Sequence, residues 1–395
     1  MTAPVAIVHD YLTQRGGAER VVLSMLKAFP SAPVYTSFYD PDGTFPEFRS
    51  VEVRTLPINR AAPLRRRHRM ALPMLAHTFS RLTVQARVVL CSSSGWAHGT
   101  RVGGRKVVYC YTPARWLYQP ASYLRGASPA TRAALNAMRP YLARWDRRAA
   151  ASADAYITSS SAVRERIRLA YGLQAELIPP PHAIDSAGPR QAVPGVPEGS
   201  FLCVSRLLPY KNLDAVVSAF RLLPDRHLVL VGDGPIAPRL RDGAPENVIF
   251  KSRVSDAELR WLYSSCRALV AASYEDFGLT PLEAAAFGKP AAVLRWGGFL
   301  DTVVEGETGL FFDSPAPESI ALVLARLEAT EFSRRRIVAH IERFSEANFI
   351  RSMRKAALPS TSPPPACGGR LEGGLAETVP LRLEEAGAWP EAVRG

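Results

Sequence analysis

Two glutamates, Glu275 and Glu283, stand eight positions apart in a short loop between an apolar run and a helical pattern. Gly278 leaves bare backbone at the tip of the loop, and the pattern Thr280, Pro281, Glu283 predicts an N-cap, a first helical residue and a capping-box partner. A strand that feeds a helix N-terminus through such a loop favours anions, because unpaired N–H groups and the helix dipole attract negative charge. The loop therefore predicts an anion site. Glu283 also has a purely structural interpretation as a capping residue, whereas Glu275 has none.

Cations that could hold such an anion follow an earlier predicted strand. Arg206 and Lys211 lie five positions apart, and together they could bind a diphosphate, arginine as a fork and lysine as a point charge. Ordinary surface cations are the alternative interpretation. The pair Gly16–Gly17 allows close backbone approach to a phosphate, and the sequence Gly232-Asp-Gly-Pro235 predicts a tight turn at a strand end, although plain turns would explain both.

The elements that must position these residues alternate between strand and helix patterns, which predicts doubly wound α/β domains. A buried strand at 5–10, a glycine loop and a helix at 18–29 open the chain. Further strands are expected at 32–38, 87–91, 106–110, 154–159 and 176–178, with helices at 129–151 and 162–171. In the second half, strands at 201–205, 227–231, 248–250, 268–272, 291–294 and 308–312 alternate with helices.

A Pro/Gly-rich interval divides the two halves and predicts the domain boundary. We expect an N-terminal domain over 1–185, a linker over 186–199 and a C-terminal domain over 200–340. A helix at 341–357 is placed to pack back on the first domain, and 358–395 has the composition of a disordered tail. The predicted ligand loops all follow strands, so we expect them to face one another across a cleft.

Composition describes a globular protein with an uneven charge. The chain has 395 residues, a net charge of +13 and five widely spaced cysteines that form no metal-ligand pattern. Neither a spanning helix nor a signal peptide is predicted, which favours a cytoplasmic location. No acidic residue lies between Glu52 and Asp146, a stretch with sixteen Lys or Arg residues. The cluster from Leu64 to Leu75 predicts contact with an anionic membrane surface, with a solvated basic face as the alternative.

Together these motifs resemble one family. The spacing from Glu275 to Glu283 matches the E-x7-E motif of retaining nucleotide-sugar glycosyltransferases of family 4, which have the GT-B fold. The segments at 205–212 and 232–235 match its diphosphate loop and strand-end turn, and those at 16–20, 253–256 and 297–309 are also similar. The resemblance extends over about residues 5–355. It implies that the N-terminal domain is on the acceptor side and that the C-terminal domain binds the nucleotide sugar. The segment Tyr109–Trp116 is most similar to bacterial mannosyltransferases of surface-polysaccharide assembly.

The resemblance implies a role for each matching residue on the donor side. Arg206 and Lys211 would bind the donor diphosphate, Glu275 the hydroxyls of the sugar and Glu283 the ribose. The other implied donor contacts are backbone or loop positions, namely Gly17, Arg253, Val254, Phe277, Gly278, Leu279 and Thr280. His98 matches a histidine near the donor sugar and completes the catalytic set with Glu275, Arg206 and Lys211; a core histidine is the alternative.

The implied activity is transfer of a hexose, mannose being favoured, from a nucleotide diphosphate sugar such as GDP-mannose to a hydroxyl with retained anomeric configuration. No metal or other cofactor is expected, because the cations can stabilise the leaving diphosphate. The acceptor is expected to be a glycan on a polyprenyl diphosphate at the inner face of the membrane.

Three departures from the family pattern affect other positions: Tyr111 where histidine is common, Asp301 where glutamate is commoner, and the hinge segment at 181–185.

Three other functions are also consistent with parts of the sequence. A nucleotide-sugar epimerase on the same fold would need no acceptor. A metal-dependent transferase of another fold could use the pair Asp40 and Asp42, although the surrounding Pro and Gly favour a surface turn. A nucleic-acid-binding protein would explain the basic charge, but the chain lacks a repeated aromatic and basic pattern.

Overall fold

The chain folds into two compact units in a computed structural model that describes residues 3–66, 71–120, 128–182 and 184–358. The first unit contains the described residues up to Pro180 together with those from Phe349 onward, and the second contains Pro181–Asn348. The sequence places the boundary in a linker at 186–199, whereas the polypeptide changes units at 180/181 and again at 348/349. The predicted tail, apart from Leu358, lies outside the described residues.

The first unit is built on a seven-stranded parallel sheet in the order β3-β2-β1-β5-β7-β8-β9. The strands are β1 (Ala3–His9), β2 (Val34–Thr36), β3 (Val53–Thr55), β5 (Ala86–Ser93), β7 (Arg105–Cys110), β8 (Ala155–Thr158) and β9 (Ala175–Leu177). A parallel pair of short strands, β4 (Thr83–Val84) and β6 (Arg101–Val102), was not predicted. The doubly wound architecture predicted for this half is present.

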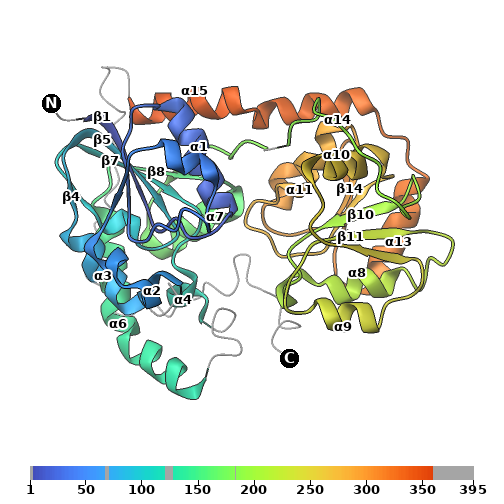
Figure 1. Ribbon diagram of the computed structural model, residues 1–395, viewed down its shortest axis with the longest axis horizontal. Helices are drawn as coiled ribbons and strands as arrows, with labels where there is room; N and C mark the ends of the chain where they lie inside the picture. The colour runs from blue at the N-terminus through green and yellow to red at the C-terminus, as the bar shows by residue number, and fades with distance from the viewer. Residues whose placement is uncertain (1–2, 67–70, 121–127, 183, 359–395) are drawn as a thin grey trace. The chain divides into compact units, whose positions relative to one another are not determined.

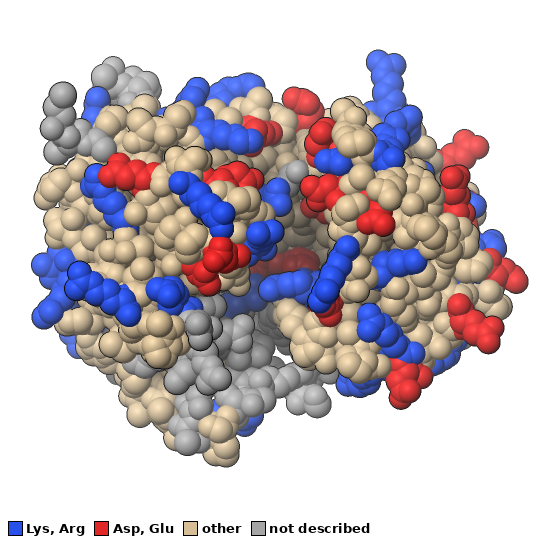
Figure 2. Space-filling model, in the orientation of Figure 1, with Lys and Arg blue, Asp and Glu red and all other residues tan. Residues whose placement is uncertain are grey.

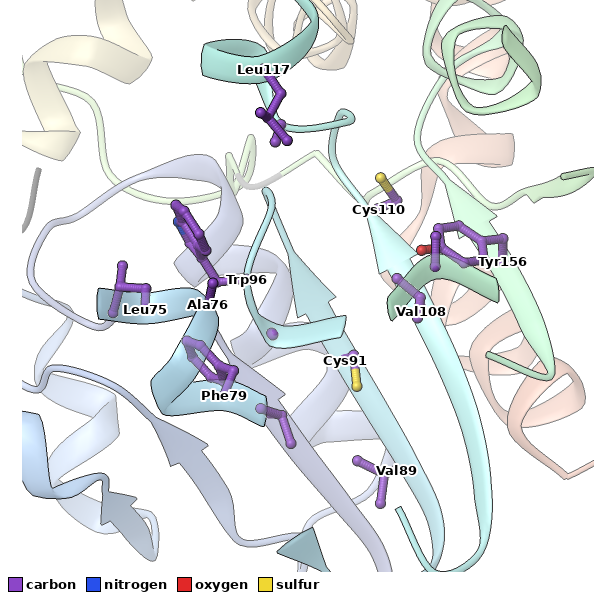
Figure 3. Packing of buried hydrophobic residues seen from close by; sticks show 14 of the residues in the cluster. Leu75, Ala76, Phe79, Val89, Cys91, Trp96, Val108, Cys110, Leu117 and Tyr156 are labelled. Carbon is purple, nitrogen blue, oxygen red and sulfur yellow. The ribbon is translucent and has the colours of Figure 1, made fainter. Parts of the chain in front are cut away.

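Apolar side chains cover both faces of this sheet, because successive residues of a strand point to opposite sides. In β1, Ala6 and Val8 join one buried cluster while Val5 and Ile7 join the other. Figure 3 shows the first cluster, where Val89, Cys91, Val108 and Cys110 of neighbouring strands meet Phe79 and Trp96. This two-sided burial explains why the strands read as continuous apolar runs.

Helices cover the two faces of the first sheet (Figure 1). Residues of α3 (Leu72–Arg81), α4 (Arg115–Tyr118), α6 (Pro129–Ala151) and α7 (Ser161–Tyr171) line the cluster in Figure 3, and α3 was not predicted. On the opposite face lie α1 (Gly17–Ala28) and α15 (Glu346–Ala357). Phe349, Met353 and Ala357 of α15 are fully buried there against strand residues.

The second unit is built on a six-stranded parallel sheet in the order β12-β11-β10-β13-β14-β15. The strands are β10 (Phe201–Val204), β11 (Leu228–Val231), β12 (Val248–Lys251), β13 (Leu269–Ala271), β14 (Ala291–Leu294) and β15 (Gly309–Phe312). The helices are α8 (Leu213–Ala219), α9 (Ala237–Asp242), α10 (Asp256–Ser265), α11 (Thr280–Ala286), α12 (Phe299–Thr302), α13 (Pro317–Glu328) and α14 (Arg334–Ile341). The capping box predicted from Ser255 and Glu258 is confirmed at the start of α10.

Each sheet reverses its winding direction at one point, which is where doubly wound folds bind ligands. In the first unit the reversal lies between β1 and β5, and in the second it lies between β10 and β13. A ligand site is therefore expected at the loops that follow these four strands.

Candidate functional site

The reversal point of the second sheet brings together two residues that are far apart in the sequence. Lys211 lies in the loop that follows β10, and Glu275 lies in the loop that follows β13. The Nζ atom of Lys211 pairs with Oε1 of Glu275, and Ser273 Oγ donates to the same oxygen over 2.8 Å. The Lys211 side chain is 9% exposed and that of Glu275 27% exposed. An ammonium and a carboxylate therefore meet at the place where the topology favours ligand binding.

The loop from Ser205 to Asn212 is fixed against its neighbours. Gly232 must lack a side chain, because a Cβ atom there would lie 1.9 Å from the carbonyl oxygen of Ser205. The Leu207 N–H donates to the carbonyl of Asp233 over 2.9 Å. The Gly232–Pro235 turn thus packs directly on the loop that carries the two cations, which gives this turn a structural purpose.

Arg206 differs from Lys211 in its environment. Its side chain is exposed, and its Nη2 atom lies 3.3 Å from the Tyr210 hydroxyl. The Lys211 ammonium, in contrast, is buried and lies 5.0 Å from the centre of the Tyr210 ring. The buried Lys211 is therefore held in an ion pair, whereas the exposed Arg206 can reach a ligand from solvent.

The loop from Ser273 to Glu283 has the predicted glycine turn but not the predicted cap. Gly278 adopts a φ of +83°, a conformation that suits glycine. Helix α11 begins one residue after Leu279, whose backbone is already helical, and no side chain caps it. The predicted capping box of Thr280 and Glu283 is therefore wrong, because a capping box needs an extended N-cap residue.

The backbone of this loop nevertheless offers donors. Among the described residues, the N–H groups of Phe277, Gly278, Leu279 and Thr280 have no hydrogen-bond partner. The Phe277 ring packs with α14 residues, and the Gly298 N–H donates to the Glu275 carbonyl over 2.9 Å. The Gly297–Gly298 segment thus fixes the backbone of the loop at Glu275. Because α11 has only seven residues, we expect its dipole to contribute less to anion binding than the charge of Lys211 does.

The half-buried Glu283 contacts a buried side chain. The Tyr263 hydroxyl, from α10, donates to Oε2 of Glu283 over 2.6 Å. Glu283 therefore bonds to Tyr263, and it takes no part in a capping box because no side chain caps α11.

Two residues other than glycine have a positive φ among those the structure describes, and both adjoin predicted donor positions. Asn212 follows Lys211 directly and has a φ of +53°, while Arg253 has a φ of +55°. The Asn212 side chain donates to the carbonyl of Ala272 over 2.7 Å and so ties the loop after β10 to the end of β13. Val254 is half-buried beside the exposed Arg253. Strained backbone of this kind is enriched at functional sites.

In the first unit, Gly17 is the first residue of α1 and is exposed. A Cβ atom at Gly17 would meet no atom within 4 Å, whereas one at Gly16 would lie 2.5 Å from Oε2 of Glu19. The open space at Gly17 suits close approach by a ligand. Burial raises the pKa of Glu19 to about 7, against backbone and Gln14 hydrogen bonds that lower it.

His98 lies in the core and is 2% exposed. Its Nε2 atom lies 3.0 Å from Oδ1 of Asp146, and its Nδ1 atom lies 3.0 Å from Oγ of Ser93. The Nδ1 atom is therefore hydrogen-bonded inside the protein, whereas Nε2 has a carboxylate at ion-pair distance without the geometry of a hydrogen bond. Because the ring is buried away from solvent, the geometry favours a positioning role, and a catalytic role stays a prediction.

A polar network at the reversal point of the first sheet was not predicted. Asp10, which follows β1, accepts hydrogen bonds from the N–H groups of Ser94 and Ala97 at 2.6 and 2.7 Å. Burial raises its pKa to about 6 despite these bonds. The Tyr111 hydroxyl lies 2.9 Å from Ser92 Oγ and donates to the carbonyl of Ala18 over 3.0 Å. Tyr111 thus joins the end of β7 to the first turn of α1.

The structure offers no support for a metal centre or a spanning helix in the described parts of the chain. No group of three or more His, Cys, Asp or Glu side chains is placed to hold a metal there. The Asp42 side chain pairs with Arg49 over 2.6 Å on an exposed turn. No helix in these parts is long and apolar enough to cross a membrane.

The basic cluster is only partly described, because residues 67–70 lie outside the described ranges. Arg65 belongs to the short helix α2 (Ala62–Arg66), and Met74 of α3 is 51% exposed. On the face drawn in Figure 2, Lys and Arg side chains lie among Asp and Glu side chains. That face is not uniformly basic.

Comparison with known protein families matches both halves of the chain. A profile described as "Glycosyltransferase Family 4" matches residues 15–185, and one described as "Glycosyl transferases group 1" matches residues 192–343. The chain belongs to the family 4 glycosyltransferases. The family inferred from the motif spacing is thus confirmed.

Curated relatives align with part of the chain. A D-inositol 3-phosphate glycosyltransferase of Corynebacterium glutamicum is 33% identical over 164 residues, which is 36% of this chain and 39% of the relative. A GDP-mannose-dependent alpha-(1-6)-phosphatidylinositol monomannoside mannosyltransferase of Mycolicibacterium smegmatis is 32% identical over 145 residues, 32% of this chain and 38% of the relative. The chain thus spans about two fifths of the length of these relatives.

Solved structures share the fold of this glycosyltransferase over most of its length. Sucrose-phosphate synthase of Thermosynechococcus elongatus has a TM-score of 0.66 at 19% identity, covering 89% of this chain and 98% of the other. Anabaena Alr3699/HepE in complex with UDP-glucose has a TM-score of 0.63 at 18% identity, with the same coverage. These similarities confirm the predicted GT-B fold.

Proposed function

We propose that this family 4 glycosyltransferase moves a hexose from a nucleotide diphosphate sugar to a hydroxyl of a lipid-linked or polysaccharide acceptor, with retained anomeric configuration. Mannose from GDP-mannose is the favoured donor sugar. The observation that carries the proposal is the pairing of Lys211 with Glu275 at the reversal point of the second sheet. Cell-surface glycan biosynthesis is the process that such a transfer would serve.

The pairing suits a donor that carries both negative charge and hydroxyl groups. A diphosphate would take the Lys211 ammonium as its counter-ion, and sugar hydroxyls would donate to the Glu275 carboxylate. Without a ligand, the Lys211 ammonium and the Glu275 carboxylate neutralise each other. When the donor binds, its phosphate and hydroxyl groups replace this contact, so neither charge is buried alone. The exposed Arg206 would add a forked contact to the diphosphate, and the unpaired N–H groups from Phe277 to Thr280 would bind sugar and phosphate oxygens.

The proposed reaction needs groups that stabilise negative charge on the leaving diphosphate, and it needs no protein nucleophile. The acceptor hydroxyl attacks the anomeric carbon on the face from which the diphosphate departs. As the new C–O bond forms, the bond to the phosphate oxygen breaks, and the hydroxyl proton passes to the departing phosphate. Lys211 and Arg206 stabilise the negative charge that grows on that phosphate, which is the kind of interaction that lowers a barrier most.

The donor preference draws support from one relative. The mycolicibacterial relative is named as GDP-mannose-dependent, whereas the structure of Anabaena Alr3699/HepE contains UDP-glucose. The experiment that tests the proposal is therefore turnover against a panel of sugar nucleotides with a membrane lipid extract as acceptor. Glu275→Ala should abolish most of that turnover, and full activity of this variant would contradict the site assignment.

A polyprenyl-diphosphate-linked acceptor would be met at the inner face of the membrane, where the protein would bind peripherally. Neutralising Arg65–Arg67 with glutamine should weaken binding to anionic liposomes, since each cation near such a surface contributes about 1 kcal/mol. The matched control is the exposed triplet Arg334–Arg336 of α14 in the second unit. Unchanged binding of the first variant, or equal loss in both, would overturn the membrane contact.

A nucleotide-sugar epimerase is the second candidate, because the same loops would hold the same donor. The assay separates the two directly. An epimerase would convert the donor sugar to an isomer without any lipid extract, whereas a transferase would release nucleoside diphosphate in step with glycolipid formation.

A further inference from the structure

The hydrogen bond between Tyr263 and Glu283 joins two helices at the predicted donor site. Tyr263 is fully buried at 0% exposure and lies in α10, and Glu283 lies in the first turn of α11. The hydroxyl oxygen of Tyr263 and Oε2 of Glu283 are 2.6 Å apart. This is the length expected of a hydroxyl that donates to a carboxylate.

The tyrosine ring is held in place independently of this bond. It stacks on the ring of Phe287 with 5.8 Å between centroids and 7° between planes. The guanidinium of Arg190 lies 5.4 Å from the centre of the same Phe287 ring. A ring fixed in this way gives its hydroxyl one direction, and that direction is toward Glu283.

The chemistry of the pair makes Tyr263 a permanent donor. Burial, and next the Glu283 charge, raise the pKa of Tyr263 well above its usual value, so its hydroxyl stays protonated across neutral pH. A carboxylate has about four lone-pair sites, so it can accept hydrogen bonds from several donors at once. The bond from Tyr263 fixes the position of Oε2 within that carboxylate.

We propose that Tyr263 is a positioning residue that orients the Glu283 carboxylate for the ribose hydroxyls of the donor nucleotide. The inference rests on the proposed function, in which Glu283 is the ribose contact. A carboxylate that must accept from two adjacent hydroxyls needs a fixed plane, and the buried phenol supplies it. Removing the hydroxyl leaves the charge in place but removes the bond that orients Oε2 of Glu283.

The test compares nucleotides that differ only in the ribose. Affinity is measured calorimetrically for GDP and UDP, and for their 2′,3′-dideoxy counterparts, with the full chain and with Tyr263→Phe. Loss of an oriented bond to a charged group should weaken binding of the better-bound ribonucleotide roughly tenfold. Binding of the dideoxy compound should change less than about twofold, because it has no hydroxyl for Glu283 to meet.

Two further variants define the meaning of the result. Glu283→Gln should also reduce the preference for ribose. Tyr109→Phe is the matched control, because Tyr109 is equally buried in the first unit and its hydroxyl donates to the Ile178 carbonyl over 2.8 Å. It should leave the preference for ribose unchanged. The ratio of the two affinities does not depend on the folded fraction of a preparation, so a destabilised variant still gives an answer.

The possible results distinguish a failure of the positioning role of Tyr263 from a failure of the proposed transferase function. If Tyr263→Phe lowers both affinities equally, or leaves the ratio unchanged while the wild-type protein prefers ribose, the positioning role is refuted and the transferase proposal stands. If the wild-type protein binds neither nucleoside diphosphate, the donor site itself is refuted and the inference falls with it.

Discussion

The charge pair of Lys211 and Glu275 allows a prediction that separates structure from catalysis. Lys211→Met removes the ammonium and leaves a carboxylate that is 27% exposed. Breaking a fully buried pair costs about 3–5 kcal/mol, so for this half-open site we expect a loss of about 1–2 kcal/mol in the free energy of unfolding. Activity should fall far more. Losing a contact to the charge that develops on the leaving group lowers kcat by about 10²–10³, or roughly 3–4 kcal/mol.

The double variant Lys211→Met/Glu275→Gln makes the test decisive. Without either charge no carboxylate is left unpaired, so stability measured by guanidinium unfolding should return close to that of the wild-type protein. Activity, measured as kcat/KM with the donor found in the panel, should stay at the level of the single variant or below. Recovery of activity in the double variant would show that the pair only holds the fold together.

An exposed ion pair in the same unit supplies the control. Arg226 lies 2.8 Å from Glu328, and Arg267 lies 2.9 Å from the same carboxylate. Because the Arg226 side chain is 46% exposed, Arg226→Gln should cost less than about 1 kcal/mol of stability and leave kcat/KM unchanged.

Three further predictions follow from the first unit. Gly17→Ala should leave the melting temperature unchanged, since its Cβ atom would meet open space, yet raise the donor KM; Gly16→Ala should lower the melting temperature through contact with Glu19. Burial raises the pKa of Glu19 from 4.5 to about 7, so the folded state binds more protons between these values and loses stability as pH rises. Glu19→Gln should gain about 2–3 kcal/mol relative to wild type by pH 8 and little below pH 4.5. Liposome binding through Arg65–Arg67 should weaken steeply with added salt.

Much of the fold could be predicted from the sequence because its signals are local. Short apolar runs between glycine and proline turns predicted the strands of both sheets except β3, which is short and lies at the edge of its sheet. Lys211 and Glu275 could be assigned to one predicted donor site because both follow such strands. Their meeting depends on strand order, which places β10 beside β13.

The parts that could not be predicted depend on tertiary contacts. The start of α11 was misplaced because the helical backbone of Leu279 follows from packing of the loop, with Phe277 on α14 and Gly298 bonded to Glu275. The pairing of His98 with Asp146 joins residues in separate elements, η4 (Ala97–Gly99) and α6. No local sequence pattern predicts a contact between residues of two separate elements.

The polar network at the first reversal point was missed for a similar reason. Asp10 meets two N–H groups of the segment that follows β5, and only the parallel pairing of β1 with β5 brings them together. The charge of the surface could not be predicted from the acid-free run either. On the face drawn in Figure 2, Lys and Arg side chains lie among Asp and Glu side chains.

The most direct test of the central claim is an NMR time course of the wild-type protein and Glu275→Ala with each sugar nucleotide and the lipid extract. We predict that one donor is consumed, that its sugar appears on a lipid with the anomeric configuration of the donor, and that Glu275→Ala slows the reaction at least a hundredfold. An inverted product, an isomerised free donor, or an undiminished rate in Glu275→Ala would contradict the account.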